Sequence, residues 1–499
     1  MKILFLPLDE RPCNLKYPSL MPIEEGVSFA FPDKSLLSLK KKVCDLKPLH
    51  DWIKQEAIDA DYFIVSMDTL LYGGIVPSRL HHDSLETLIQ RSNILKEIKE
   101  INPNIKIFAN ELIMRTPSYS LSDEEPDYFD ICGRELWQYG VYLDLEERGL
   151  IKEEEIVEFN KLKETINPQY LSDLMNRREI NKQAIYNTLN LYKDGVIDYL
   201  IIPQDDCFPF GFTSRDRKDI LTYIKQINLE KELIMHPGAD EAGLTLLARV
   251  LNDYHKTSLK TYVIYTSELG RGAIPCFEDR GVEITIASHI KACGLTLTDD
   301  YENSDIVLFV NNWDYFTGSS KEEVLKINEG RDLSEFINKL IKAINDNKIV
   351  GIADNVLCNS GDEKLFLKLF ENELFKSIHS YAGWNTSSNT LDTTICGLVA
   401  YYFSKDDYKK NYFLLHRYVE DFFYMGSVRD EVINKINNNP KWNIKINDLK
   451  NLKSPLEQFA KERLERLIYK YQLNILHPFL KISIDFVWNR TFEIDLIIE

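Results

Sequence analysis

The sequence lacks the short motifs that mark several common classes of site. It contains no CxxC pair among its eight cysteines, and no HxH or HExxH among its nine histidines. This spacing argues against a zinc ribbon, a disulfide framework and a histidine-rich zinc site. Glycine-rich phosphate loops (GxGxxG, GxxxxGK[ST]) and the GxSxG elbow of serine hydrolases are also absent. Nucleotide binding and catalysis by a serine or cysteine nucleophile therefore have little support.

Long apolar runs and a surplus of basic residues are missing too. No stretch approaches the ~18 uninterrupted apolar residues of a membrane span, and the N-terminal MKILFLPLDE reaches its acids too early for a signal peptide. The 78 acidic residues outnumber the 60 basic ones, so neither nucleic acid nor an anionic membrane is expected as a partner. We expect a cytoplasmic protein that acts on an uncharged or cationic small molecule without a cofactor; the oligomeric state stays open.

Apolar segments of strand length alternate with helical segments over the first four-fifths of the chain. Strands are predicted at 2–8, 62–67, 106–109, 199–202, 232–235, 261–265, 282–287, 305–310, 348–353 and 377–381. Such alternation implies parallel strands joined by helices. Because polar clusters follow nearly every strand, the pattern favours a (β/α)8 TIM-like barrel over the competing open, doubly wound sheet.

The predicted α/β chain has two parts. Residues 1–400 are expected to form the barrel-like catalytic domain, with a highly charged helical insertion at about 123–193, where glycine and proline are scarce. Residues 401–499 are interpreted as a mostly helical accessory segment packed on the barrel.

The most informative stretch is YLIIPQDDCFPFG (199–211), in which a short apolar strand ends in two adjacent aspartates. Neighbouring side chains on a regular strand point to opposite faces, whereas Asp205 and Asp206 on the following loop can turn into one pocket. Two carboxylates in one pocket repel each other, so one tends to keep its proton near neutral pH. That division suits general acid/base catalysis; the alternative is a solvated acidic loop or a pair that caps the next helix.

Polar residues after the other strands are predicted to line the same pocket. Carboxylates accept hydrogen bonds from sugar hydroxyls, arginines donate them, and an indole offers a flat apolar face. The alternatives are local salt bridges, a core tryptophan and helix-capping asparagines. The predicted substrate-binding residues are Asp9, Glu10, Arg11, Asp68, Tyr72, Arg79, Asn110, Arg115, Asp240, Glu241, Asn311, Asp354, Asn359, Asp362, Trp384, Asn385 and Asn389, and no metal ligand is assigned.

Motifs along the whole chain resemble a bacterial family catalogued as domain of unknown function 4127. They are LPLDERP (6–12), Asp68 with LLYGG (70–74) and Ser78-Arg79, PQDD (203–206), GADE (238–241), Asn359 with Gly361-Asp362, YAGWNT (381–386) with Asn389-Thr390, and WNR (488–490) with Glu493. The family has no known activity, so the resemblance carries little functional information.

The tandem aspartates are also similar to those of O-GlcNAcase and hyaluronidase-like barrel glycosidases. That similarity implies that Asp205 orients the substrate's N-acetyl group while Asp206 protonates the leaving oxygen; the residues alone do not decide which aspartate is the acid. We expect a glycoside hydrolase that acts on a small neutral or N-acetylated sugar conjugate. The alternatives are a divalent-metal hydrolase and a non-enzymatic carbohydrate-binding protein. The metal ligands of the former would be Asp9, Asp68, Asp205, Asp240 and Asp362.

Overall fold

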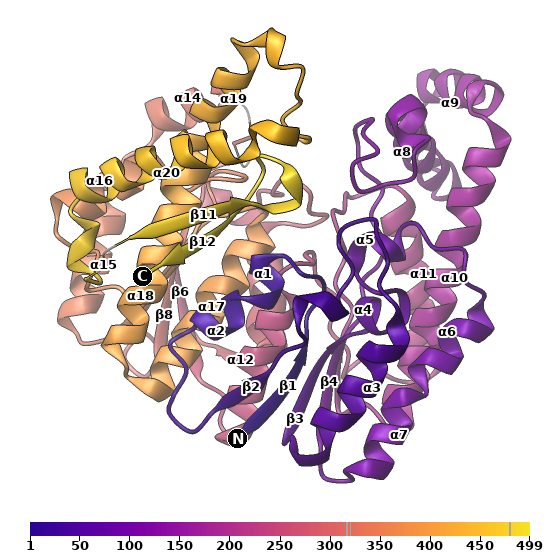
Figure 1. Cartoon of the computed structure of the whole chain (residues 1–499), viewed down its shortest axis with the longest axis horizontal. Coiled ribbons are helices and arrows are strands. Elements are labelled where there is room, and N and C mark those ends of the chain that lie inside the picture. Colours follow the sequence, from indigo (N-terminus) through magenta and orange to yellow (C-terminus); the bar gives the residue numbers. More distant parts are fainter. Residues whose placement is uncertain (316–317, 320, 479–480) are drawn as a thin grey trace. The chain divides into compact units, whose positions relative to one another are not determined.

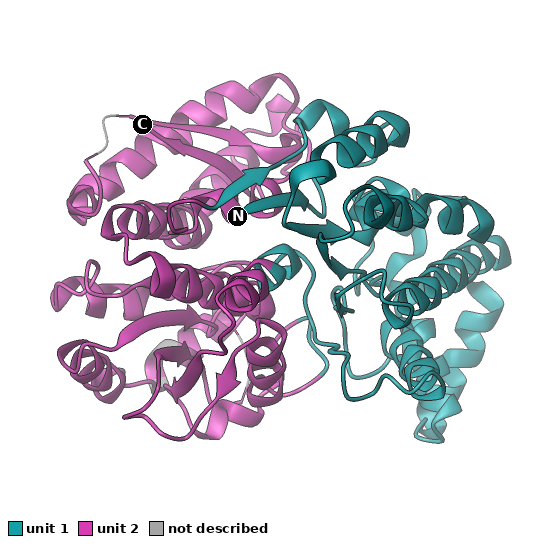
Figure 2. Cartoon of the chain, turned by 90° about the horizontal axis from the view of Figure 1, so that it is seen from below, with its two compact units in different colours: residues 1–10, 27–246, 277–279 teal, residues 11–26, 247–276, 280–499 magenta. Residues whose placement is uncertain are grey.

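A computed structural model of the chain describes residues 1–315, 318–319, 321–478 and 481–499. The chain divides into two compact units, each assembled from segments that are far apart in sequence (Figure 2). Unit 1 comprises residues 1–10, 27–246 and 277–279, and unit 2 comprises residues 11–26, 247–276 and 280–499. The predicted boundary at residue 400 lies inside a helix of unit 2, α17 (Ser387–Ser404).

A five-stranded parallel sheet forms the centre of unit 1, with the strand order β2-β1-β3-β4-β5. Nearly every residue of β1, β3 and β4 is buried, which explains why these strands are continuous apolar runs in the sequence. The segment predicted as a strand at 232–235 contributes only an isolated bridge, Ile201 to Ile234. The strands are β1 (Lys2–Leu6), β2 (Ser28–Ala30), β3 (Tyr62–Ser66), β4 (Lys106–Asn110) and β5 (Tyr199–Ile201) (Figure 1).

The long connection between β4 and β5 in unit 1 is helical. Its helices α8 and α10, together with α11, enclose a small apolar core that includes Phe129, Leu136 and Phe212. Asn167 caps α10 by accepting from the backbone N–H of Gln169. The helices of unit 1 are α3 (Leu46–Glu56), α4 (Met67–Tyr72), α5 (Ile75–Ser78), α6 (Leu85–Ser92), α7 (Ile94–Ile101), α8 (Phe129–Glu147), α9 (Glu153–Thr165), α10 (Pro168–Lys193) and α11 (Phe212–Gln226), with 3-10 turns η1 (Lys34–Leu36) and η2 (Ala57–Asp59).

Unit 2 contains a second five-stranded parallel sheet, in the order β10-β9-β8-β6-β7. Counted from its own first strand, it repeats the order of unit 1, with the first strand between the second and the third. Two further strands, β11 and β12, form an antiparallel pair. The strands are β6 (Lys260–Tyr265), β7 (Thr296–Leu297), β8 (Ile306–Asn311), β9 (Ile349–Asp354), β10 (Ser380–Ala382), β11 (Ile482–Phe486) and β12 (Ile494–Ile498).

The helices of unit 2 include an uncommon one. Helix η4 (Tyr418–Val428) is a π-helix that continues α18 and leads into α19. π-helical segments are rare and frequently occur at functional sites. The other elements are α1 (Pro12–Leu15), α2 (Tyr17–Leu20), α13 (Val282–Ala292), α14 (Lys321–Gly330), α15 (Ser334–Asn345), α16 (Glu363–Glu371), α17, α18 (Asp407–Arg417), α19 (Arg429–Asn437) and α20 (Lys453–Lys470), with 3-10 turns η3 (Leu269–Gly272), η5 (Pro440–Trp442), η6 (Lys450–Leu452), η7 (Leu473–Ile475) and η8 (Val487–Asn489); α12 (Ala242–Tyr254) begins in unit 1 and continues in unit 2.

The α/β class predicted from the sequence is confirmed, but the closed (β/α)8 barrel is not, because the described strands form two open sheets. In a barrel each new strand is added on the same side until the sheet closes. Here the second and third strands of each unit pair with opposite sides of the first, which leaves two edges. Polar residues after strands occur in both architectures, so they could not distinguish a barrel from open sheets.

The segment predicted as a strand at 282–287 is instead the start of helix α13. Its buried residues fall at helical spacing, namely Val282, Thr285, Ile286, His289 and Ile290. The β-branched side chains suggested a strand, but burial of one helical face prevailed over this local preference. Among the helices that the structure describes, none has the length and apolarity needed to cross a membrane.

Gly140 of α8 gives a test of the packing in unit 1. A Cβ at this position would come within 2.5 Å of the ring of Phe212, which is buried at the start of α11. We expect Gly140→Ala to lower the free energy of unfolding by about 1–3 kcal/mol, because the ring has no free space to enter. Thermal denaturation measures the loss. Gly272→Ala is the matched control, since no atom lies within 4 Å of its Cβ; equal melting temperatures for both variants would contradict this packing.

Candidate functional site

The carboxyl ends of the unit 1 strands bring several predicted site residues to one edge of the sheet. Asp9 follows β1, Asp68 lies in the first turn of α4 after β3, Asn110 ends β4, and Asp205 and Asp206 follow β5. Because the pairings are parallel, these ends point the same way. β2 pairs with one side of β1, and the later strands β3, β4 and β5 are added on the other side. Open α/β sheets commonly bind ligands where the order of the strands reverses in this way.

Two arginines hold the tandem aspartates. The Nη2 atom of Arg79 lies 2.7 Å from Oδ2 of Asp205, and the Nη1 atom of Arg115 lies 2.8 Å from Oδ2 of Asp206. Both arginines were predicted as substrate-binding residues. The structure shows that each also fixes the direction of one aspartate, so the two carboxylates cannot rotate freely.

Glu124 and Glu125 share the same two guanidinium groups. Glu124 Oε2 lies 2.9 Å from Arg79 Nη1 and 3.3 Å from Arg115 Nη2, while Glu125 Oε1 lies 2.8 Å from Arg115 Nε. We refer to Arg79, Arg115, Glu124, Glu125, Asp205 and Asp206 as the Arg79–Arg115 cluster. These four carboxyl groups lie within ion-pair distance of the two guanidinium groups in a largely buried place, and burial raises the pKa of Glu125.

Asp206 differs from Asp205 in its exposure and its backbone. Its side chain is 21% exposed, against 6% for Asp205. Its φ of 23° falls in the left-handed region that non-glycine residues rarely adopt, and such strain is concentrated at functional sites. Burial, together with the adjacent Asp205, raises the pKa of Asp206 to about 6, although Arg115 and Arg79 act in the opposite direction. Asp206 is therefore both reachable and partly protonated near neutral pH.

Two deeply buried acids lie close together at the ends of β3 and β4. Burial raises the pKa of Asp68 to about 7, while the backbone N–H of Leu112 donates to its Oδ2 at 3.0 Å and partly offsets the rise. Burial raises the pKa of Glu111 to about 8, and the nearby Asp68 adds to the effect. The hydroxyl of Thr188 lies near Glu111 without meeting hydrogen-bond geometry. Glu111 was not among the predicted site residues.

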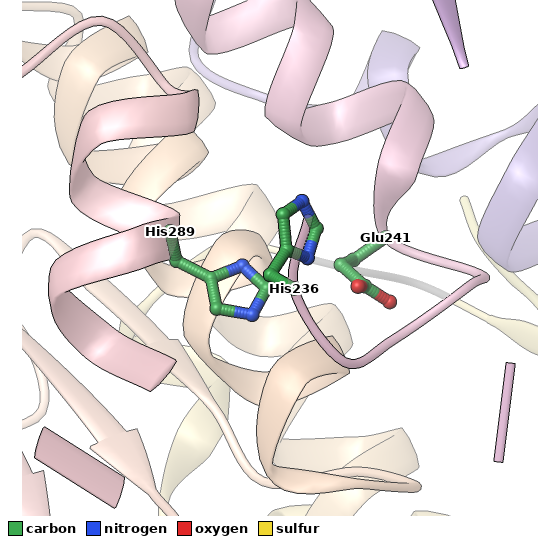
Figure 3. Close-up of side chains that lie close together, drawn as sticks. All are labelled: His236, Glu241 and His289. Atoms are coloured by element: carbon green, nitrogen blue, oxygen red, sulfur yellow. The ribbon is translucent and has the colours of Figure 1, made fainter. Parts of the chain in front are cut away.

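The predicted residues Asp240 and Glu241 precede α12, and Figure 3 shows Glu241 where the loop leads into this helix. This loop is joined to the loop of Asp205 by two backbone hydrogen bonds, from Gln204 to His236 at 2.8 Å and from Gly238 to Gln204 at 2.9 Å. Glu241 also accepts from the N–H of Ala239 at 3.0 Å. The structure therefore places this loop beside the tandem aspartates within unit 1.

The corresponding edge of the unit 2 sheet is a closed network. Asn311 donates to Asp354 at 2.7 Å and to Asp362 at 3.0 Å, and Tyr381 donates to Asp354 at 2.9 Å. Arg331 forms an ion pair with Asp362. Burial and the neighbouring Asp362 raise the pKa of Asp354 to about 7. Because these groups are buried and bonded to one another, they stabilise the sheet edge and leave little for a ligand.

Trp384 and Asn385, also in unit 2, line a pocket that is partly open to solvent. The pocket is further lined by Tyr17 and by Glu420 and Asp421 of η4. Burial raises the pKa of Asp421 to about 6, while Arg417 opposes the rise. We call this cavity the π-helix pocket.

Several predicted residues have structural roles. Asn389 forms a reciprocal cap with Thr386 at the start of α17. Asn359 has a positive φ of 65° and donates its N–H to the carbonyl of Asn385 at 2.8 Å, so it shapes the loop below the pocket. Glu10 accepts from the N–H of Lys40 at 2.9 Å, and the ring of Tyr72 packs against that of His81 with the two planes tilted by 39°.

Arg11 lies in unit 2, with its guanidinium 4.8 Å from the ring centre of Trp488 and 4.0 Å from Glu493. It therefore contacts residues near the C-terminus of the chain, although it was grouped with its sequence neighbours Asp9 and Glu10.

A serine, a histidine and an aspartate of unit 2 are also aligned. The two ring nitrogens of His289, in α13 (Figure 3), lie 3.1 Å from Oγ of Ser388 and 2.8 Å from Oδ2 of Asp392. This arrangement, with a histidine between a serine and an aspartate, resembles the catalytic triad of a serine hydrolase. All three side chains are 0% exposed, so the arrangement joins α13 to α17 rather than offering a nucleophile to a substrate.

One protein family matches almost the whole chain. Its model, described as protein of unknown function (DUF4127), matches residues 3–497. The chain belongs to this family. No curated protein matches it. The resemblance stated from the motifs is thus confirmed for this DUF4127 chain, whereas the similarity to barrel glycosidases stays a prediction.

Besides Glu111, sequence reasoning missed four acids of the DUF4127 chain that lie at the candidate sites: Glu124, Glu125, Glu420 and Asp421. Each occurs in an adjacent acidic pair, the same signal that drew attention to Asp205 and Asp206. The missing clue was the position of each pair relative to a strand end: neither new pair directly follows a predicted strand. It is the folded structure that brings these pairs to the candidate sites, so their positions in the sequence did not indicate a role.

The raised pKa of Glu111 predicts how stability depends on pH. The folded chain binds more protons than the unfolded chain between the ordinary value of 4.5 and about 8, so stability is lost as pH rises through that window. Glu111→Gln removes this contribution. We expect the loss of unfolding free energy between pH 5 and pH 8 to be smaller by about 2–4 kcal/mol in the variant.

Chemical denaturation at the two pH values measures the difference. The control is Glu86→Gln, which changes an exposed residue of α6. A pH dependence that is the same in the Glu111→Gln variant as in the unchanged chain would contradict the placement of Glu111.

Proposed function

We propose that the chain is a glycoside hydrolase that acts on a small neutral or N-acetylated sugar conjugate, with Asp206 as general acid/base and Asp205 as its partner. The observation that carries the proposal is the Arg79–Arg115 cluster. Adjacent aspartates are held there in different surroundings, which is how enzymes divide the roles of acid and base between two carboxyl groups. The same proposal places the enzyme in the cytoplasm, since its cysteines lack the spacing of a disulfide framework.

Asp206 suits the role of acid because a group with a pKa of about 6 carries a proton for part of the time at neutral pH and can still release it. Its greater exposure lets it approach the oxygen that joins the sugar to its leaving group. Asp205 is largely buried and pinned by Arg79, so it suits the role of a fixed acceptor.

In the substrate-assisted form of the reaction, Asp206 gives its proton to the leaving oxygen as the bond from the sugar's anomeric carbon breaks. The oxygen of the N-acetyl group attacks that carbon, while Asp205 accepts a hydrogen bond from the acetamido N–H and keeps the group in place. Water then attacks the same carbon as its bond to the acetyl oxygen breaks and the N-acetyl amide is restored, and the water passes a proton to Asp206, which restores the enzyme. With the barrel excluded, support from the barrel glycosidases is reduced to analogy with the tandem aspartates.

The alternative of a divalent-metal hydrolase receives less support from the contacts. Asp205 and Asp362 are each paired with an arginine, and the pKa of Asp68 is raised to about 7. Metal ligands must be deprotonated and directed at the ion. The third alternative is a sugar-binding protein without activity, and a measurement of substrate turnover is what distinguishes it from the proposal.

The role of Asp206 is tested with paired substrates that differ in leaving group. We expect Asp206→Asn to reduce kcat/KM by about 100- to 10,000-fold on a glycoside with a poor leaving group such as methanol. The reduction should be smaller on the matching nitrophenyl glycoside, because nitrophenolate leaves without protonation. Asp194→Asn, at an exposed position, is the control. Equal losses on both substrates would rule out Asp206 as the acid.

The pH profile and a chelator complete the test. For the unchanged chain, kcat/KM should fall above a midpoint near pH 6, because the acid must be protonated, and this limb should vanish in the Asp206→Asn variant. Treatment with a chelator should leave the rate unchanged. Loss of activity with the chelator, restored by Mg²⁺ or Mn²⁺, would favour the metal hydrolase instead.

A further inference from the structure

We propose that the π-helix pocket of unit 2 binds a single neutral sugar ring. No substrate-binding role was predicted for the residues of η4, and the pocket does not depend on the acid/base chemistry of unit 1. A sugar can therefore occupy it whether or not the chain cleaves one.

The pocket is assembled from four stretches of unit 2 that lie far apart in sequence. Tyr17 lies in α2, Trp384 in the loop after β10 and Asp421 in η4, and Glu493 is the residue that precedes β12. The wall of the pocket includes a π-helix, and such segments frequently mark function because they disturb the regular helical ladder.

The acidic side chains of the wall are fixed by neighbours. Glu420 accepts from the hydroxyl of Tyr17 at 3.0 Å and forms an ion pair with Arg417. Asp421 accepts from Nη1 of Arg417 at 2.8 Å and from the backbone N–H of Gly383 at 2.9 Å. Held carboxylates present acceptors in set directions, which is what recognition of hydroxyl groups requires.

The charges of the pocket are balanced by nearby guanidinium groups. Glu420 and Asp421 share Arg417, while Glu493 lies 2.9 Å from Arg490 and 4.0 Å from Arg11. Each of these three carboxylates thus has an arginine within 4.0 Å. A cationic ligand would meet no uncompensated negative charge, and an anionic one would meet fixed carboxylates. The balance favours a neutral polar ligand.

The apolar part of the wall is rigid and aromatic. The rings of Trp384 and Tyr17 meet edge to face, with centroids 5.5 Å apart. Trp384 donates its ring N–H to Thr393 at 3.1 Å, which fixes the indole. A flat aromatic surface beside directed acceptors matches a pyranose, which has an apolar C–H face and a rim of hydroxyls. Asn385 adds an amide that can both donate and accept.

The test measures binding to the full chain carrying Asp206→Asn, so that turnover does not consume the probe. The probes are methyl β-glucopyranoside, methyl β-galactopyranoside and N-acetylglucosamine, with choline as the cationic comparison. Calorimetric titration should show saturable binding of at least one sugar, and of none of the cation. Trp384→Phe and, separately, Met425→Trp, which fills the pocket, should each weaken that binding about tenfold or more.

Trp442→Phe is the control, because it changes a tryptophan of unit 2 outside the pocket; melting curves of all variants confirm that they fold. The proposal is overturned if no sugar binds, if choline binds more tightly than the sugars, or if the filled-pocket variant retains full affinity. If the pocket binds a sugar but the chain hydrolyses none, the glycosidase proposal is refuted and the sugar site stands. If the chain hydrolyses a sugar through Asp206 but the pocket binds none, the sugar site is refuted and the glycosidase proposal stands.

Discussion

Four carboxyl groups share two guanidinium groups, those of Arg79 and Arg115, in a largely buried cluster of unit 1, and the candidate site depends on this pairing. Burial disfavours the charged form of a carboxyl group, so the burial of several acids in one cluster favours retention of a proton by some of them. Asp206 combines a raised pKa with exposure at the rim of the cluster. The cluster that holds these side chains in place therefore also contains an acid, Asp206, that a ligand can reach.

The two units have the same strand order and use the edge of their sheets differently. In unit 1 the strand ends carry acids whose pKa values are raised to different extents, such as Asp68 and Asp206. In unit 2 the equivalent edge is closed by hydrogen bonds among Asn311, Asp354 and Tyr381. Its pocket is built instead where η4 interrupts regular helical geometry beside the loop of Trp384. The shared topology therefore brings polar residues to the same edge of each sheet, but it does not determine whether those residues are bonded to one another.

Much of the secondary structure could be predicted because the strands are buried on both faces. Ile3–Leu6 and Tyr62–Ser66 are apolar runs for that reason, and the polar residues that follow them were recognised. The barrel was wrong because the number of strand–helix repeats contains no information on which side of β1 the chain adds its next strand. Helix α13 was missed because its β-branched residues hid a helical spacing of buried positions.

The hydrogen bond between Tyr17 and Glu420 could not be predicted, because the two residues are 403 positions apart in the sequence. The central claim, that Asp206 holds a proton near neutral pH, is tested most directly by carbon-13 NMR of chain labelled at the aspartate carboxyl carbons. A titration should show a resonance with a midpoint near pH 6 that disappears in the Asp206→Asn variant. If the resonance lost in that variant instead titrates near the ordinary aspartate value of about 3.9, the claim is contradicted.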